Sequence, residues 1–442
     1  MSAVLAIDVH ALIDRGPVGR LQKLVLLFGF CIITLEGFDI SVMSFIAPVL
    51  KQQWQIGNHA LGAVLSVTQA GLALGALTAG PLADRFGRKV VVLVSIVAFG
   101  LLTLATALAT DLGWLILVRL LVGFAIGSVV PNTVTLVSEY MPERIQAFSV
   151  ALIICAVALS GTCGGFLSAV MIPRFGWQSV LILGGVLPLL LVPVLMMQLP
   201  ESVRFLVVRQ APAARIHAII DRMAPGAATA QAVFVLPVEP AQPSAIRTVL
   251  SAKYRFGSLM LWTAYFAALF ASNILSGWLP TLMKESGYSL SNAATLAGIY
   301  QAGGVIGSLV LGWAMDRGNA HKVPPLAYFA SGALLCGLSA SYHVFSLIAV
   351  QAFLLGFCLI GAISGANALS AVFHPTAARA TGSCWMHGAG RWGALLSILA
   401  GAQMLELGWD AADVFRSLIV PAVLAGLALL AKSRHRLGPL AD

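Results

Sequence analysis

The chain has 442 residues, of which 59% are hydrophobic and only 10% are charged, and its mean hydropathy is +0.93. A soluble globular protein carries about 25% charged residues. This chain therefore has more apolar side chain than an ordinary core can bury, and lipid must solvate much of it. The formal net charge of +9 would suit a nucleic-acid-binding protein, but the distribution of the basic residues excludes that class.

Twelve apolar runs are long enough to cross a bilayer, which takes about 20 helical residues. Lipid-spanning backbone must satisfy its own hydrogen bonds, and continuous apolar runs favour helices over the alternating strands of a barrel. We therefore predict an all-α integral membrane protein with twelve transmembrane helices. The predicted spans are 24–50, 60–82, 90–110, 113–137, 148–171, 177–198, 258–282, 293–315, 323–342, 344–371, 380–404 and 413–432.

Residues 1–23 are predicted to be a cytoplasmic N-terminus, because they contain charges and lack the compact apolar core of a cleavable signal. With this end inside, most of the 26 lysines and arginines fall on the cytoplasmic side. The exceptions are two arginines within spans and four residues outside, namely Arg119 and Arg391, and Lys51, Arg174, Lys284 and Arg416. This positive-inside bias predicts a multi-pass protein of the cell membrane, here a bacterial inner membrane, with both termini cytoplasmic.

The first span contains two carboxylates, Glu36 and Asp39, in an otherwise apolar run. A charge at the bilayer centre costs about 2.5–3.5 kcal/mol on insertion scales, so intramembrane ionisable residues are functional candidates by default. Residues three apart lie on one face of a helix, and Gly37 between them allows close approach. The alternative is a fixed pairing with an arginine that only holds helices together.

The two halves of the chain contain an internal repeat. Residues Gln69-Ala70-Gly71, Gly75, Gly80, Asp84 and Arg85 recur, each displaced by 232 residues, as Gln301-Ala302-Gly303, Gly307, Gly312, Asp316 and Arg317. The repeat relates the second span to the eighth. Parallel six-helix repeats are a known design of secondary transporters, with the substrate site near the midplane. Glycine pairs such as Gly71/Gly75 and Gly303/Gly307 are interpreted as helix-packing contacts.

The polar segment 199–257 is predicted to be a cytoplasmic linker, with short surface helices around Ala213–Met223 and Ser244–Tyr254. It separates an N-terminal six-helix bundle (24–198) from a C-terminal one (258–432), and a cytoplasmic tail (433–442) follows. The six cysteines lie in apolar runs without metal-ligand spacing, so we expect small core residues rather than a metal site.

The eleventh span contains Arg391 and, one turn earlier, His387. The stretch Gly388 to Gly393 matches the G-x-G-x-x-G dinucleotide pattern, but no strand precedes it and it lies within a span, so we reject that interpretation. There is no phosphate-loop pattern and no signature of an intramembrane enzyme. We expect neither a cofactor nor catalysis.

Two motifs carry a family resemblance. Gly80-Pro-Leu-Ala-Asp84-Arg85-Phe-Gly87-Arg88-Lys89 resembles the loop between spans 2 and 3 of the major facilitator superfamily, and Gly312 to Lys322 is a degenerate copy of it. Pro200-Glu201-Ser202-Val203-Arg204 resembles the segment after span 6 in sugar and organic-anion porters of that superfamily. The resemblance implies two pseudo-symmetric six-helix bundles and alternating access.

Within that superfamily, the first span resembles the aromatic acid:proton symporter family. Its signature D-G-x-D appears here as Glu36-Gly-Phe-Asp39, with Glu for the first Asp. Arg119 with Gly123, Gly127, Pro131 and Asn132 is similar to that family's span 4, and Arg379, Gly382, Trp385, Gly390 and Arg391 are similar to its span 11. The longer acid at position 36 affects substrate identity more than mechanism.

These residues lead to the hypothesis of proton-coupled uptake of a small aromatic carboxylate, such as a benzoate or hydroxybenzoate. Asp39, and secondarily Glu36, would carry the coupling proton, since burial and a nearby arginine act oppositely on a carboxyl group. Arg119 and Arg391 are candidate clamps for the substrate carboxylate, because a guanidinium group binds carboxylate bidentately. Which arginine binds the substrate and which pairs with an acid is left open.

Other polar and aromatic groups are weaker candidates for substrate contact, and helix packing is the alternative for each. They are His387, Phe38, Tyr265, Phe266, Tyr300, Gln301, Trp385 and Asn367. The resemblance implies a gating role at the cytoplasmic ends of the spans, where the alternative is topogenic charge with weak exposed pairing. The gating candidates are Gly80, Asp84, Arg85, Gly87, Arg88, Asp316, Arg317, Glu139 and Arg144.

The nearest alternative function is a sugar, polyol or other organic-anion porter, which gives no evident reason for two buried arginines if the substrate is neutral. A drug:proton exporter or a non-transporting membrane sensor is less well supported. We expect a monomer whose partners are the aromatic carboxylate, protons and the lipid bilayer.

Overall fold

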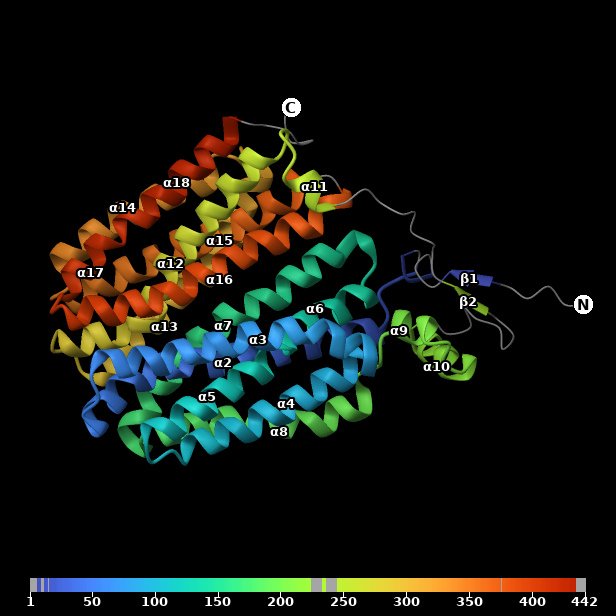
Figure 1. The fold of residues 1–442 in the computed structure, drawn as a ribbon, viewed down its shortest axis with the longest axis horizontal. Coiled ribbons are helices and arrows are strands. Elements are labelled where there is room, and N and C mark those ends of the chain that lie inside the picture. Colours follow the sequence, from blue (N-terminus) through green and yellow to red (C-terminus); the bar gives the residue numbers. More distant parts are fainter. Residues whose placement is uncertain are drawn as a thin grey trace, which may run out of the picture. The chain divides into compact units, whose positions relative to one another are not determined.

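The structure is a computed structural model that describes residues 6–8, 12–14, 16–223, 233–235, 245–374 and 376–434. Its elements are almost all helices (Figure 1). The N-terminal half contains α2 (Arg20–Trp54), α3 (Asn58–Phe86), α4 (Arg88–Ala107), α5 (Leu112–Gly127), α6 (Val129–Tyr140), α7 (Glu143–Phe175) and α8 (Gln178–Gln198). The C-terminal half contains α12 (Arg255–Glu285), α13 (Leu290–Arg317), α14 (Val323–Ser341), α15 (Phe345–Phe373), α16 (Thr376–Glu406), α17 (Ala411–Ser417) and α18 (Ile419–Arg434).

Each predicted span corresponds to a long helix or to a pair of consecutive helices. The fourth span is divided between α5 and α6 at Ser128, and the twelfth between α17 and α18 at Leu418. In both cases a proline, Pro131 or Pro421, lies three residues after the break. A proline lacks the amide hydrogen that would bond to the carbonyl four residues earlier, which accounts for the lost hydrogen bond at each break. Proline alone does not determine a break, because α8 continues through Pro188 and Pro193.

Within the described residues, eleven helical stretches are long and apolar enough to cross a membrane. The stretches include α5–α6 as Leu112–Tyr140 and α17–α18 as Ala411–Ser433. Helix α16 is not among them, although its 31 residues are sufficient in length. It includes His387, Arg391 and Gln403, and these polar side chains lower its hydropathy. The helix that is least suited to lipid is therefore the one that carries the predicted C-terminal site.

The linker contains three short helices, α9 (Val203–Val208), α10 (Ala213–Met223) and α11 (Ala245–Val249). The predicted helix at 213–223 is confirmed, whereas the one predicted at 244–254 is shorter because α11 ends at Val249. Two three-residue strands, β1 (Ala6–Asp8) and β2 (Val233–Val235), pair in parallel with Ala6 opposite Val233. Strands this short and this distant leave no periodic signal in a sequence, and they were not predicted.

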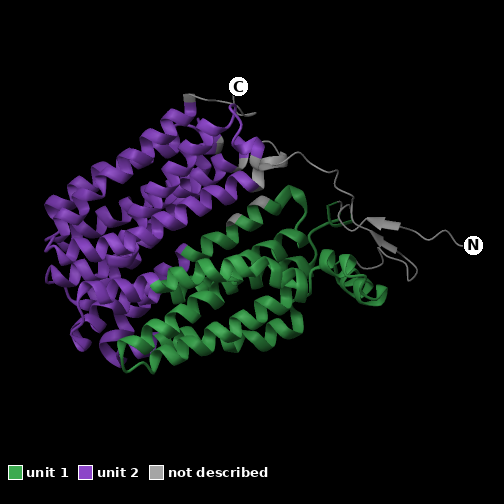
Figure 2. Cartoon of the chain, viewed as in Figure 1, with its two compact units in different colours: residues 1–40, 67–157, 181–240 green, residues 41–66, 158–180, 241–442 purple. Residues whose placement is uncertain are grey.

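The chain divides into two compact units (Figure 2). Unit 1 comprises residues 1–40, 67–157 and 181–240, and unit 2 comprises 41–66, 158–180 and 241–442. The core of unit 1 is apolar and includes Phe28, Phe99 and Val122. Two isoleucines of α10, Ile216 and Ile220, belong to this same core, so this linker helix is anchored to unit 1.

The internal repeat has a direct counterpart in helix packing. In unit 1, a β-carbon on Gly75 of α3 would collide with the carbonyl oxygen of Phe124 in α5. In unit 2, a β-carbon on Gly307 of α13 would collide in the same way with the carbonyl oxygen of Phe357 in α15. These glycines let the paired helices approach to backbone contact. The predicted packing role of both pairs is confirmed.

Candidate functional site

Asp39 of α2 and Arg119 of α5 form a fully buried ion pair inside unit 1. Arg119 Nη1 donates to Asp39 Oδ2 at 3.0 Å, and both side chains have no exposed surface. Arg119 Nε also donates to Thr68 Oγ1 of α3 at 3.2 Å, and Thr103 Oγ1 of α4 donates to Asp39 Oδ1 at 2.7 Å. Four helices therefore meet at one carboxylate and one guanidinium group, and each charge has hydrogen-bond partners.

The other two candidates on this stretch of α2 are also buried in unit 1. Glu36 is 3% exposed, one turn before Asp39. Phe38 points toward α8, because a β-carbon on Gly184 would lie 3.3 Å from Phe38 Cε1. This contact makes helix packing a sufficient account of Phe38.

A second polar cluster lies in unit 2, where α16 packs on α12. The Tyr265 hydroxyl group is 3.1 Å from His387 Nδ1, and the two rings meet edge to face at 5.1 Å. Asn367 of α15 and Arg391 both lie near the same hydroxyl group. Gly390 allows the Tyr265 ring to pack against α16, since a β-carbon at this position would collide with that ring. In contrast to Arg119, both Arg391 and His387 are exposed side chains.

The remaining substrate candidates occupy other positions in unit 2. Tyr300 is buried and its hydroxyl group is 3.1 Å from Ser272 Oγ. Gln301 packs on α7 at Gly161, and Phe266 stacks on Phe270 with ring centroids 6.5 Å apart. Trp385 is exposed and lies 5.4 Å from the Trp262 ring. Of the predicted C-terminal residues, the structure thus gathers Tyr265, His387, Asn367 and Arg391.

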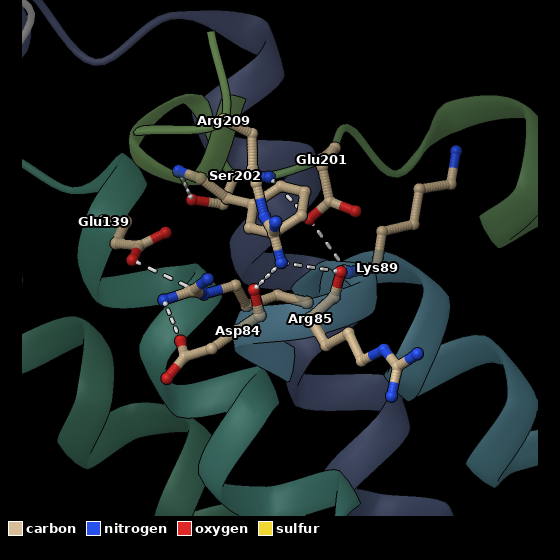
Figure 3. A network of polar contacts seen from close by, with 9 residues as sticks. Asp84, Arg85, Lys89, Glu139, Glu201, Ser202 and Arg209 are labelled. Atoms are coloured by element: carbon tan, nitrogen blue, oxygen red, sulfur yellow. Dashed lines mark hydrogen bonds and ion pairs between the residues drawn. The ribbon is translucent and has the colours of Figure 1, made fainter. Parts of the chain in front are cut away.

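The loop between α3 and α4 is the centre of a polar network at one end of unit 1 (Figure 3). Arg88 pairs with Asp84 at 3.2 Å and with Glu139 of α6 at 3.8 Å. Arg209 Nη2, which follows α9, donates to the carbonyl oxygens of Asp84 and Arg85. The network therefore connects the loop between α3 and α4, which we call the signature loop, to both α6 and the start of the linker.

Glu201 is the member of this network that the predicted site omitted. Its Oε1 accepts hydrogen bonds from the backbone amides of Lys89 at 3.1 Å and Ser202 at 2.9 Å (Figure 3). Tyr140 donates to the Glu201 carbonyl oxygen at 2.6 Å. Gly87 has a φ of +98°, and a β-carbon there would collide with Glu201 Oε2. Gly87 and Glu201 belong to the two motifs at Gly80 to Lys89 and Pro200 to Arg204. Both motifs were identified from the sequence, but their contact with each other was not predicted.

The other gating candidates have separate environments. Arg144 donates to the carbonyl oxygens of Asp14 and Gly16, both at 2.7 Å. Arg317 lies over the Trp313 ring at 4.8 Å, and the side chain of Asp316 lies outside the described residues. A β-carbon on Gly80 would meet nothing within 4 Å, so no close contact requires that glycine.

Residues 29–398 and 261–440 match the family model described as Major Facilitator Superfamily. The chain belongs to the major facilitator superfamily. The same fold occurs in an inward-open structure of the xylose transporter XylE from E. coli, with a TM-score of 0.71, 16% identity, and coverage of 92% of this chain and 95% of that one. At this identity the likeness concerns the fold alone. It confirms the prediction of the major facilitator fold.

Two curated relatives of this superfamily member are similar over nearly the whole chain. The 4-hydroxybenzoate transporter PcaK of Pseudomonas aeruginosa is 42% identical over 434 residues, covering 98% of this chain and 97% of the relative. The gallate transporter of Pseudomonas putida is 43% identical over 432 residues, covering 98% and 96%. The resemblance to aromatic acid transporters of this superfamily is thereby confirmed.

Proposed function

We propose that the protein takes up a small hydroxylated aromatic carboxylate together with a proton, by alternating access. The observation that carries the proposal is the buried pair of Asp39 and Arg119, with no exposed side-chain surface on either residue. The relatives named for 4-hydroxybenzoate and gallate transport support the substrate class. We propose no catalytic role for the chain.

Asp39 suits a coupling role because it is a buried carboxylic acid beside a guanidinium group. In general, a buried acid without a counter-charge holds its proton, whereas an acid beside a guanidinium group is ionised. A change that moves Arg119 relative to Asp39 would therefore load the acid with a proton, and the reverse change would release it. Thr103, which donates to Asp39 Oδ1, holds the carboxyl group in place.

Arg391 suits the substrate carboxylate better than Arg119 does. Arg119 is buried and already pairs with a carboxylate, so a second anion would have to displace Asp39. Arg391 is exposed on a helix within the membrane part of the chain, and an exposed charge there is tolerated where it faces water or a ligand. His387, Tyr265 and Asn367 beside it offer donors and acceptors for a ring hydroxyl group.

We further propose that the protein lies in a bacterial inner membrane with both termini in the cytoplasm. We propose that it acts as a monomer. The contact of Lys51 with Glu285 supports the parallel arrangement, because it brings the C-terminal ends of α2 and α12 together. The odd-numbered spans of both halves would then run in the same direction, as a parallel repeat requires.

Transport into proteoliposomes under an imposed pH gradient tests the proposal. Labelled 4-hydroxybenzoate should accumulate in the presence of a gradient and should equilibrate without one. Asp39→Asn should abolish the gradient-driven accumulation and retain exchange of external for internal substrate. If Asp39→Asn accumulates 4-hydroxybenzoate as the unaltered protein does, the coupling role is wrong. If neither protein transports any hydroxybenzoate, the substrate class is wrong.

A further inference from the structure

A pocket lies in unit 2 where the ends of α2 and α12 meet, far along α2 from Asp39. Its volume is about 430 Å³, within the roughly 300–1,000 Å³ typical of small-molecule sites. The lining is polar for a membrane protein and comes from α2, the turn after it, and α12. The residues are Pro48, Lys51, Gln52, Gln55, Ile56, Gly57, Thr281, Lys284 and Glu285.

The charges in this pocket do not balance. Lys51 pairs with Glu285, whereas Lys284 has no ion pair with any carboxylate among the residues that the structure describes. The lining therefore carries two ammonium groups and one carboxylate, a surplus of one positive charge. Such a surplus attracts a small anion by Coulomb interaction.

A buried polar group in the same pocket is unsatisfied. Thr281 is 1% exposed, and its Oγ1 has no hydrogen-bond partner among the residues that the structure describes. A buried hydroxyl group without a partner destabilises the folded state, so a ligand oxygen that bonded to it would recover part of that cost. The apolar Pro48 and Ile56 beside these groups provide a surface for a ring.

We propose that this pocket is a capture site for the aromatic carboxylate, separate from the cluster around Arg391, and occupied before the substrate reaches that cluster. The proposal rests on the proposed function, which places this end of α2 at the outer face. The substrate carboxylate would bind Lys284 and compete with Glu285 for Lys51, while its ring would lie on Pro48 and Ile56. Thr281 would hydrogen-bond to a substrate oxygen.

Two substitutions at adjacent positions should then act in opposite directions on uptake. Lys284→Gln should raise the KM for 4-hydroxybenzoate about two- to fivefold, with little change in maximal velocity. Glu285→Gln removes the competing carboxylate and should lower the KM by a similar factor. Arg416→Gln is the matched control, because this exposed residue pairs with Asp413 and does not line the pocket. It should leave the KM unchanged.

Direct binding separates this proposal from the proposed function. In neutral detergent, 4-hydroxybenzoate should bind Asp39→Asn with Lys284 intact, and Lys284→Gln or Thr281→Val should lose the weaker of two binding events. This readout does not depend on transport. Vesicles of zwitterionic lipid, compared with vesicles containing phosphatidylglycerol, test for a lipid phosphate as the natural anion. An effect of Lys284→Gln confined to anionic vesicles would overturn the proposal, as would KM shifts of both charge variants in the same direction or none at all.

Discussion

Arg119 shows how strongly a single residue's role depends on its surroundings. Sequence alone makes it a candidate clamp for the substrate, equivalent to Arg391, because both are arginines within spans. In the structure its guanidinium group donates to Asp39 and Thr68 without any exposed surface. The two arginines therefore differ in their surroundings. Arg119 is buried and pairs with the Asp39 carboxylate, whereas Arg391 is exposed.

Removal of Arg119 alone should destabilise the protein strongly. Arg119→Ala leaves the Asp39 carboxylate buried without a counter-charge, and breaking a buried pair in this way costs about 3–5 kcal/mol. The double variant Asp39→Asn/Arg119→Gln removes both charges and should recover most of the loss. Thermal unfolding of the purified proteins in detergent measures this, and a double variant no more stable than Arg119→Ala would contradict it.

Arg391→Lys should weaken substrate binding without affecting folding. The lysine keeps the charge but not the planar pair of donors that binds carboxylate bidentately. We expect the KM for 4-hydroxybenzoate to rise about tenfold, equivalent to about 1.4 kcal/mol. Uptake kinetics measure it, with Arg416→Lys as the control outside the predicted sites. An unchanged KM in Arg391→Lys would assign the substrate carboxylate to another group.

His374 introduces a pH dependence at the end of α15. The side chain is buried, and its Nε2 lies 2.9 Å from Ser258 Oγ. Burial lowers the pKa of His374 from its usual 6.5, and the nearby charge of Lys432 lowers it further. A hydrogen bond to the backbone of Ser370 raises the pKa and offsets part of this effect. The unfolded chain therefore binds more protons near pH 6 than the folded chain does. Stability should accordingly fall as the pH drops below about 6.5.

The measurement is the slope of the melting temperature against pH. His374→Gln should flatten the decrease in melting temperature between pH 7.5 and pH 5, whatever its effect at neutral pH. His343→Gln is the control, since His343 is an exposed histidine of the same unit. Equal slopes in the unaltered protein and in His374→Gln would show that other groups determine the acid sensitivity.

At the scale of elements, helix α13 contains two glycines with different surroundings. A β-carbon on Gly307 would collide with the backbone of Phe357, whereas one on Gly312 would meet nothing within 4 Å. The first glycine is needed for backbone contact between α13 and α15, and the second is not. The repeat conserves both positions within the chain, as Gly75 and Gly80, so the repeat alone does not distinguish them.

The same substitution at these two positions should therefore have opposite effects. Alanine is favoured over glycine inside a helix by roughly 0.5–1 kcal/mol, so Gly312→Ala should be neutral or slightly stabilising. Gly307→Ala forces the two helices apart and should lower the melting temperature and the yield of monodisperse protein. Similar yields and melting temperatures for both variants would show that α13 and α15 can separate at little cost.

At the scale of the whole molecule, we propose that the network around Arg88 takes part in alternating access. It joins the signature loop, α6 and the segment after α8 through Glu139 and Glu201. Asp84, in contrast, has an exposed side chain that pairs with Arg88 four residues away. Arg88 is only 16% exposed, but a pair in which one partner lies in solvent contributes little to stability. Asp84 can therefore change partners during conformational exchange at low cost.

Asp84→Asn should therefore reduce the rate of transport without reducing the amount of folded protein. We expect a lower maximal velocity for uptake, with unchanged melting temperature and unchanged binding of 4-hydroxybenzoate in detergent. Glu201→Gln is an informative comparison, because Glu201 is buried and accepts two backbone hydrogen bonds; it should lose stability as well. Normal velocity in Asp84→Asn at normal abundance would remove it from the gating machinery.

Sequence alone determined the membrane class, the number and order of spans, the repeat and the intramembrane charges, because hydropathy, charge and glycine spacing are local properties that lipid makes decisive. Tertiary structure alone decided that Arg119 pairs with Asp39, that Glu201 contacts Gly87, and that Lys51, Thr281 and Lys284 share one pocket. These are contacts between residues far apart in the chain, and they depend on the rotation and depth of each helix, which an all-round apolar helix does not encode in its own pattern.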